Sequence, residues 1–129
     1  MIGSPVSVLV VEDDKYISSA YKTKFEAEGF NSKVAYNGKE AISLLKVFHP
    51  DVIVLDLVMP RSDGFEVLDK LRKNTKWRQI PVIIASNLEE KTHIKKAQNF
   101  QANEYVFKSN LTLVDLVNRI KEIKQEQSS

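Results

Sequence analysis

The sequence has no cysteine and only two histidines, and these absences exclude several classes of chemistry. Without cysteine the chain can form no disulfide, no thiolate nucleophile and no cysteine-based zinc site. His49 and His93 fall in different segments, so a histidine metal cluster is not expected either. No apolar run approaches the roughly 20 residues that a membrane-spanning helix requires, so no membrane partner is expected.

An excess of charge of one sign is also lacking. The 19 Lys and Arg residues against 17 Asp and Glu give a net charge of +2 and a pI near 8.8. This mild balance does not indicate a nucleic-acid-binding surface, so no direct nucleic-acid binding is expected. The start, Met1 to Pro5, lacks the charged and then apolar pattern of a signal peptide. We therefore expect one cytoplasmic domain over residues 1–129, with its core in about 6–124 and no effector domain in this chain.

The hydrophobic pattern alternates between two periods along the chain. Short apolar runs predict strands over residues 6–11, 52–56, 82–86 and 104–107, and residues 31–35 can form a further short strand. Helical spacing of apolar residues predicts helices before Gly29, over 41–48, 64–74 and 89–100, and from Leu113 to Ile123, with a frayed polar tail at 125–129. Five strands that alternate with five helices imply an α/β fold with a parallel sheet covered on both faces.

Polar and charged residues follow these strands where each one ends. Asp56 follows the apolar run 52–55, Glu12, Asp13 and Asp14 follow 8–11, and Lys108 follows 105–107. Ser86 ends the run 82–85. In parallel sheets the ligand crevice lies beyond the carboxyl ends of the strands, so these side chains are expected to converge.

The converging carboxylates predict a site for a hard divalent cation. Carboxylates at one spot repel one another unless a cation intervenes, and Mg²⁺ prefers oxygen ligands. Asp13 or Glu12, together with Asp14 and Asp56, could hold Mg²⁺. Lys108 would supply a fixed positive charge, and the hydroxyl of Ser86 could bind a phosphate oxygen. This set suits phosphoryl transfer to Asp56.

Each of these residues has an ordinary explanation when it is taken alone. An Asp after a strand is most often a turn former, and Glu12, Asp13 and Asp14 could simply begin a helix. Lys108 could be a solvated charge and Ser86 a helix cap. Their joint occurrence at the ends of four predicted strands favours a functional site.

The sequence resembles the receiver domains of two-component response regulators from Val6 to Ile123. The matching segments are Val10 to Asp14, Asp56 to Pro60 with Asp63 and Gly64, Pro81 to Ser86, and Tyr105 to Lys108. The resemblance implies a flavodoxin-like fold with strand order 2-1-3-4-5. It also implies that Asp56 is the phosphoacceptor and that Mg²⁺ binds Asp13, Asp56 and the backbone near Val58, with Asp14 or Glu12 helping through water.

By the same resemblance, Lys108 pairs with the phosphoryl group, Ser86 is a hydroxyl switch and Tyr105 is an aromatic switch. The implied phosphoryl donor is a sensor histidine kinase or a histidine phosphotransfer protein. The implied output is a downstream protein that binds the fourth helix, the fifth strand and the fifth helix. Such a domain is a switch rather than a turnover enzyme, with at most Mg²⁺-dependent self-phosphorylation and slow autodephosphorylation.

Two positions depart from the pattern of that family, and two more bear on the lifetime of the acyl phosphate. Ser109 follows Lys108 where proline is usual, and we expect the Lys108–Ser109 peptide to be cis nonetheless. Asn87 stands where alanine or glycine is usual, which bears on access to Asp56. Val58 and Leu88 are apolar beside the expected route of a hydrolytic water, which predicts slow decay of the acyl phosphate.

Two other functional hypotheses fit part of this pattern. A haloacid-dehalogenase-type phosphatase also uses an Asp nucleophile and Mg²⁺, but it needs a second Asp where Val58 stands. A degenerate receiver that binds partners without phosphorylation stays open because of Asn87 and Ser109.

Overall fold

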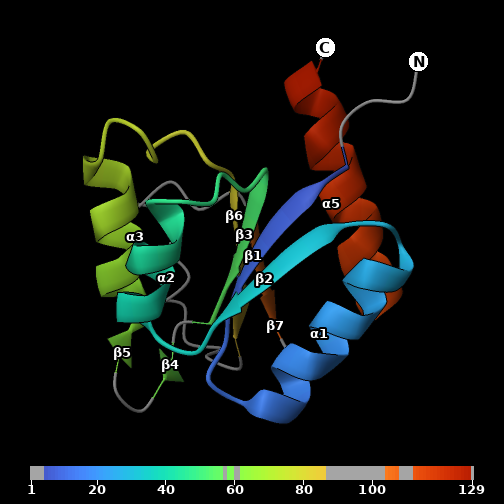
Figure 1. Ribbon diagram of the computed structural model, residues 1–129, viewed down its shortest axis with the longest axis horizontal. Helices are drawn as coiled ribbons and strands as arrows, with labels where there is room; N and C mark the ends of the chain where they lie inside the picture. The colour runs from blue at the N-terminus through green and yellow to red at the C-terminus, as the bar shows by residue number, and fades with distance from the viewer. Residues whose placement is uncertain (1–4, 57, 60–61, 87–103, 108–111, 129) are drawn as a thin grey trace.

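A computed structural model describes residues 5–56, 58–59, 62–86, 104–107 and 112–128, with the main chain alone at 58–59, 62–63, 86, 104–107 and 128. The strands and helices alternate along the chain, as the hydrophobic pattern predicts (Figure 1). Their bounds are β1 (Ser7–Val11), α1 (Lys15–Ala27), β2 (Asn31–Ala35), α2 (Gly38–Leu45), β3 (Val52–Leu55), β4 (Val58–Met59), β5 (Ser62–Asp63), α3 (Gly64–Lys73), β6 (Val82–Ser86), β7 (Glu104–Phe107) and α5 (Leu113–Ser128). The helix predicted over 89–100 lies outside the described residues, and so does the Lys108–Ser109 peptide.

The central sheet has five parallel strands in the order β2-β1-β3-β6-β7. Val11 of β1 is level with Leu55 of β3, and Leu55 is level with Ile84 of β6. The carboxyl ends of these three neighbouring strands therefore lie at one edge of the sheet. That edge is where the sequence predicts the site.

Two hydrophobic clusters cover the two faces of the sheet. The α2 and α3 helices lie against one face, and α1 and α5 lie against the other (Figure 1). Alternate residues of one strand face opposite clusters, so Leu9 packs with the α2 and α3 side and Val10 with the α1 and α5 side. Both residues are wholly buried, as expected for a parallel sheet that is covered on both faces.

The α1 helix has well-defined ends. The Asp14 carboxylate accepts hydrogen bonds from the main-chain N–H groups of Tyr16 and Ile17, which caps the first turn. Gly29 has a positive φ of 82°, and its N–H donates to Glu26 while that of Phe30 donates to Phe25. This is the Schellman pattern, for which glycine is favoured, so the expected stop at Gly29 is confirmed.

Three local expectations were wrong. The α2 helix ends at Leu45 rather than near His49, because its last turn tightens into hydrogen bonds from Lys46 to Ser43 and from Val47 to Leu44. A small antiparallel pair of two-residue strands, β4 and β5, precedes α3 and has no counterpart in the predicted elements. The C-terminal tail is helical to Ser128 instead of frayed.

Asp51 explains how the tail of α5 is held. Its carboxylate accepts from the N–H of Ser7 at 2.8 Å and from Lys124 Nζ at 2.9 Å, and its own N–H donates to the Ser7 carbonyl at 2.7 Å. The side chain of Gln127 also donates to the Asp51 carbonyl. One residue therefore joins β1, β3 and α5 at the amino ends of the strands, opposite to the predicted site.

We predict that Asp51→Ala lowers the free energy of unfolding by about 2 kcal/mol, because it removes a half-buried ion pair and leaves the N–H of Ser7 without its acceptor. Urea denaturation measures the change. The matched control is Asp69→Ala, which removes an exposed ion pair with Lys73 on α3 and is expected to cost less than about 0.5 kcal/mol. Equal losses in the two variants would contradict the role given to Asp51.

Candidate functional site

Three carboxylates meet at the edge of the sheet where β1 and β3 end. Glu12, Asp13 and Asp56 each offer an oxygen atom, and these atoms all lie within 4.8 Å of one another. Glu12 is 1% exposed and Asp56 is 6% exposed, whereas Asp13 is half-buried. Two of the three acids are thus held in the protein interior, where carboxylates are seldom found.

The main chain fixes this arrangement by continuing the hydrogen-bond ladder past the ends of the strands. The N–H of Glu12 donates to the Ala35 carbonyl at 3.0 Å, and the N–H of Asp56 donates to the Val11 carbonyl at 3.0 Å. Because Val11 is level with Leu55, the residues that follow them, Glu12 and Asp56, come to lie side by side. The convergence of these acids follows from the parallel register.

The donor set suits a hard divalent cation. All three groups offer carboxylate oxygens, with no sulfur or imidazole nitrogen among them, and oxygen donors of this kind favour Mg²⁺. Placing carboxylates this close costs Coulomb energy that a cation removes. This part of the edge can therefore hold a metal ion between Glu12, Asp13 and Asp56.

Asp14, which was also predicted to help bind the metal, lies outside this group of three acids. Its carboxylate points to the first turn of α1, where it accepts from two main-chain N–H groups, and it is not among the three grouped acids. Glu12, which was predicted only as a possible ligand, is in the group, and one of its oxygens also accepts from the Asp14 N–H at 3.2 Å. The signal for this exchange was the helix-start position of Asp14, directly before the apolar spacing of α1.

The main chain of β6 and β7 places two more predicted residues at or near this edge. Leu55 is level with Ile84, so Asp56 is level with Ala85 and Ser86 comes next. Ser86 is in turn level with Phe107, and Tyr105 is level with Ile84. The side chains of Ser86 and Tyr105 lie outside what the structure describes, and so does all of Lys108.

Val58 was predicted to offer its backbone to the metal. The structure places it in β4, two residues after Asp56, paired with Asp63 of β5. This small antiparallel pair gives the segment after Asp56 a defined main-chain course before α3 begins at Gly64. The contact of the Val58 backbone with the metal stays a prediction.

Comparison with known proteins shows which family has these features. The profile of the response regulator receiver domain matches residues 8–121. The receiver domain of response regulator 1452 from Francisella superposes with a TM-score of 0.85 and 35% identity, over 96% of this chain and 99% of that one.

No helix in the described part of the chain is long and apolar enough to cross a membrane.

Two curated relatives are longer than this chain. "Response regulator MprA" of Mycolicibacterium vanbaalenii is 35% identical over 80 residues, which are 62% of this chain and 34% of that protein. "Probable transcriptional regulator ycf29" of Porphyra purpurea is 42% identical over 77 residues, which are 60% of this chain and 37% of that protein. The matched segments thus span about a third of the length of these two relatives.

The family match covers most of the chain, and its fold is the flavodoxin-like α/β fold with a parallel sheet that the structure displays. The acidic edge at Glu12, Asp13 and Asp56 lies where that fold places ligands. The chain belongs to the response regulator receiver domains of two-component signalling systems.

Proposed function

We propose that Asp56 accepts a phosphoryl group and that Glu12, Asp13 and Asp56 hold the Mg²⁺ ion that this transfer requires. One observation carries the proposal: Asp56 is buried at the end of β3 with oxygen atoms of Glu12 and Asp13 within 4.8 Å of its own. Phosphoryl transfer depends on positioning and on neutralising charge, and a fixed acidic cluster around a carboxylate nucleophile suits both needs.

The reaction forms one bond and breaks one. An Asp56 carboxylate oxygen attacks phosphorus, the new O–P bond gives an acyl phosphate, and the bond from phosphorus to the donor breaks with its electron pair going to the donor. Bound Mg²⁺ would offset the negative charge of the incoming phosphoryl oxygens and of the acids. The buried position of Asp56 restricts water around the nucleophile, and by family resemblance Lys108 pairs with a phosphoryl oxygen.

The switch follows from the neighbours of Asp56 in the sheet. The phosphoryl group adds about −1.5 to −2 charges and new acceptor oxygens beside the end of β6. Ser86 would move to donate a hydrogen bond to them, and β7 would respond because Ser86 is level with Phe107 in the same ladder. Tyr105, on β7, would then change rotamer and alter the face formed by the fourth helix, β7 and α5. A phosphoryl group can shift such populations only if the two states differ by a few kcal/mol.

The partners follow from the family. A sensor histidine kinase or a histidine phosphotransfer protein would supply the phosphoryl group, and a downstream protein would read the altered face. Such donors act on cytoplasmic receivers, which agrees with the expected location. The domain would not turn over a substrate: it would self-phosphorylate from a small donor and lose the group slowly.

A phosphorylation-independent scaffold is the alternative function. Its support is limited to Asn87 and Ser109, both outside the described residues. Retention of all three carboxylates, two of them buried, favours the phosphoacceptor, because a scaffold has no use for charges that are costly to bury.

We expect Asp56→Asn to abolish phosphorylation. The protein is incubated with Mg²⁺ and acetyl phosphate, and intact-mass spectrometry looks for one added phosphoryl group. Asp69→Asn, which removes a half-buried acid on α3, is the matched control and should gain the group like the original chain. An added phosphoryl mass in Asp56→Asn, or its absence from all three proteins even with a cognate kinase, would contradict the proposal.

Magnesium binding should distinguish the grouped acids from Asp14. Glu12→Gln and Asp13→Asn should each weaken Mg²⁺ binding at least about tenfold in isothermal titration calorimetry, because each removes a charged ligand. Asp14→Ser should leave the affinity within about twofold and the stability nearly unchanged, since serine also caps helices well. A loss in Asp14→Ser as large as that in Asp13→Asn would restore Asp14 as a ligand.

The role of Tyr105 is tested separately from phosphorylation. Tyr105→Phe should behave like the original chain, because the ring is kept, whereas Tyr105→Ala should accept the phosphoryl group but show smaller phosphorylation-induced amide shifts in β7 and α5 by NMR. Equal shifts in Tyr105→Ala and the original chain would remove the tyrosine from the mechanism.

A further inference from the structure

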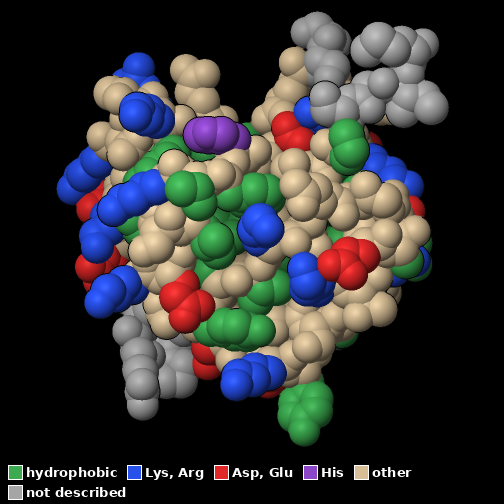
Figure 2. Space-filling view, in the orientation of Figure 1, with side chains coloured by type: hydrophobic (Ala, Val, Ile, Leu, Met, Phe, Trp, Pro, Cys, Tyr) green, Lys and Arg blue, Asp and Glu red, His purple; other side chains and the backbone are tan. Residues whose placement is uncertain are grey.

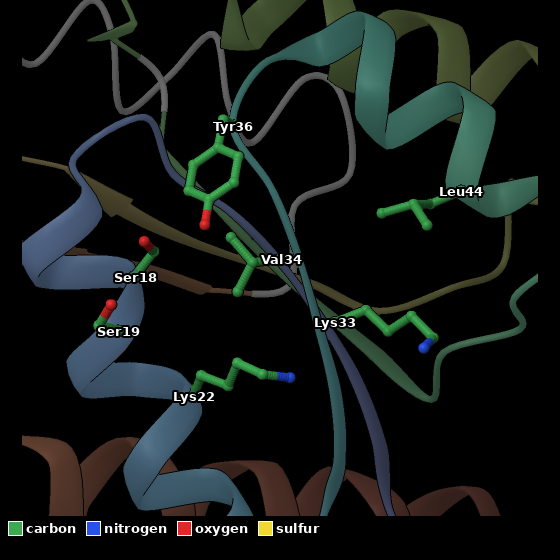
Figure 3. Close-up of a pocket in the computed structure, with 7 residues that line it drawn as sticks. All are labelled: Ser18, Ser19, Lys22, Lys33, Val34, Tyr36 and Leu44. Atoms are coloured by element: carbon green, nitrogen blue, oxygen red, sulfur yellow. The ribbon is translucent and has the colours of Figure 1, made fainter.

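The sheet has a hollowed and basic surface at the edge formed by β2. A hollow of about 300 Å³ lies between α1, β2 and α2 (Figure 3), and a second of about 460 Å³ adjoins it over α2. Val34 and Leu44 line both hollows, so the two form one groove with an apolar floor, called here the β2 groove. Figure 2 shows this face of the molecule, where hydrophobic side chains gather at the centre with Lys and Arg around them.

The outer side of β2 exposes main-chain groups to this groove. The N–H of Asn31 and the carbonyl of Ala35 bond toward β1, to Val6 and Glu12. Hydrogen-bonding direction alternates along a strand, so Ser32, Val34 and Tyr36 direct their main-chain groups away from the sheet. β2 is the end of the five-stranded sheet, and no strand of the described residues lies beyond it.

Two side chains already cover part of this edge. Lys22 Nζ donates to the Ser32 carbonyl at 3.0 Å, and Glu40 Oε1 accepts from the Tyr36 N–H at 2.9 Å. Between them lies Val34, whose outward N–H donates to no described residue and whose outward carbonyl accepts from none. Among the described residues of this edge, Val34 is therefore the one at which neither main-chain group is covered by a side chain, and it lies in the middle of the groove.

The rim of the groove carries unneutralised positive charge. Lys33 and Lys39 line it, and neither has a carboxylate within ion-pair distance among the described residues, although Lys33 Nζ lies 5.8 Å from the Phe48 ring centroid. Glu40, the acid at this rim, already accepts from Tyr36 and Asn37. Carboxylates of a ligand would meet two cations here.

We propose that the β2 groove binds an extended acidic segment of a partner protein. One residue of the segment would exchange two hydrogen bonds with the main chain of Val34, as in strand addition to a sheet edge. Its apolar side chains would cover Val34 and Leu44, and its carboxylates would pair with Lys33 and Lys39. A second copy of this chain fits less well, because two such grooves would bring the same lysines together.

This surface lies at the opposite edge of the sheet from β7. An acidic segment on β2 and a partner on the proposed output face could therefore bind at the same time. Binding at the groove does not need the phosphoryl group, so Asp56→Asn should still bind the acidic segment. The failure of one proposal can therefore be told apart from the failure of the other.

The probe is a synthetic ten-residue peptide of alternating glutamate and valine, titrated into ¹⁵N-labelled protein. NMR shifts should be largest around Val34 and Leu44. Lys33→Ala combined with Lys39→Ala should weaken binding about tenfold, because two partly exposed ion pairs are lost. The matched control, Lys76→Ala with Arg78→Ala, removes the same charge from the exposed segment before β6 and should bind normally.

A peptide of the same sequence with N-methyl groups on alternate residues separates strand pairing from charge attraction. Because it cannot form the paired hydrogen bonds, it should bind more weakly by the same shifts. Equal binding of the methylated peptide, an equal loss in the control variant, or shifts centred away from β2 would overturn the proposal. Concentration-dependent shifts at Val34 without any peptide would assign the groove to a second copy and would also overturn it.

Discussion

The burial of negative charge at the carboxyl edge of the sheet is the constraint on which the rest of this structure depends. Glu12 and Asp56 are almost wholly inaccessible to water, and transferring a carboxylate out of water is among the largest single costs in a fold. The ladder of β1 and β3 is extended so that the two acids lie beside Asp13, which adds Coulomb repulsion to that cost. A cation at that point would convert mutual repulsion into attraction.

The amino and carboxyl ends of the parallel strands serve different purposes. At the amino ends of the strands, Asp51 joins β1, β3 and α5 through hydrogen bonds and an ion pair that have structural roles. At the carboxyl ends, the three acids lie close together in an arrangement that the stability of the fold alone would not favour. Functional sites often place side chains where they destabilise the folded state, and here such side chains are confined to one end of a well-packed domain.

Much of the fold could be predicted because the buried strands carry uninterrupted β-branched runs. Val82 to Ser86 has the bounds that this pattern indicates. Asn31 to Ala35 also has its expected bounds, although it is only partly buried and contains one β-branched residue. The β4 and β5 strands could not be found, since two residues are too few to show a period. Ala20 stands at the helical spacing of the apolar residues of α1 but is exposed, because a small residue fits either face of a helix.

The site was predictable in kind and less so in detail. The convergence of acids follows from strand ends, which the sequence marks clearly at Asp56. The choice between Glu12 and Asp14 depends on one residue of register at the end of β1, and neighbouring acids look alike in a sequence. The tail of α5 was misjudged for a related reason: Lys124 and Gln127 reach Asp51, a residue far away in the chain, and no local pattern reports such a contact.

The side chains that cover β2 have a consequence for how the chain folds. Lys22 belongs to α1 and Glu40 to α2, so the hydrogen bonds they make to the outer main chain of β2 exist only after both helices have docked. Before that point the sheet presents a bare edge, which is the kind of surface through which partly folded chains associate. Protection of the sheet against intermolecular pairing is therefore a late product of assembly, and it depends on helices rather than on the strand that it protects.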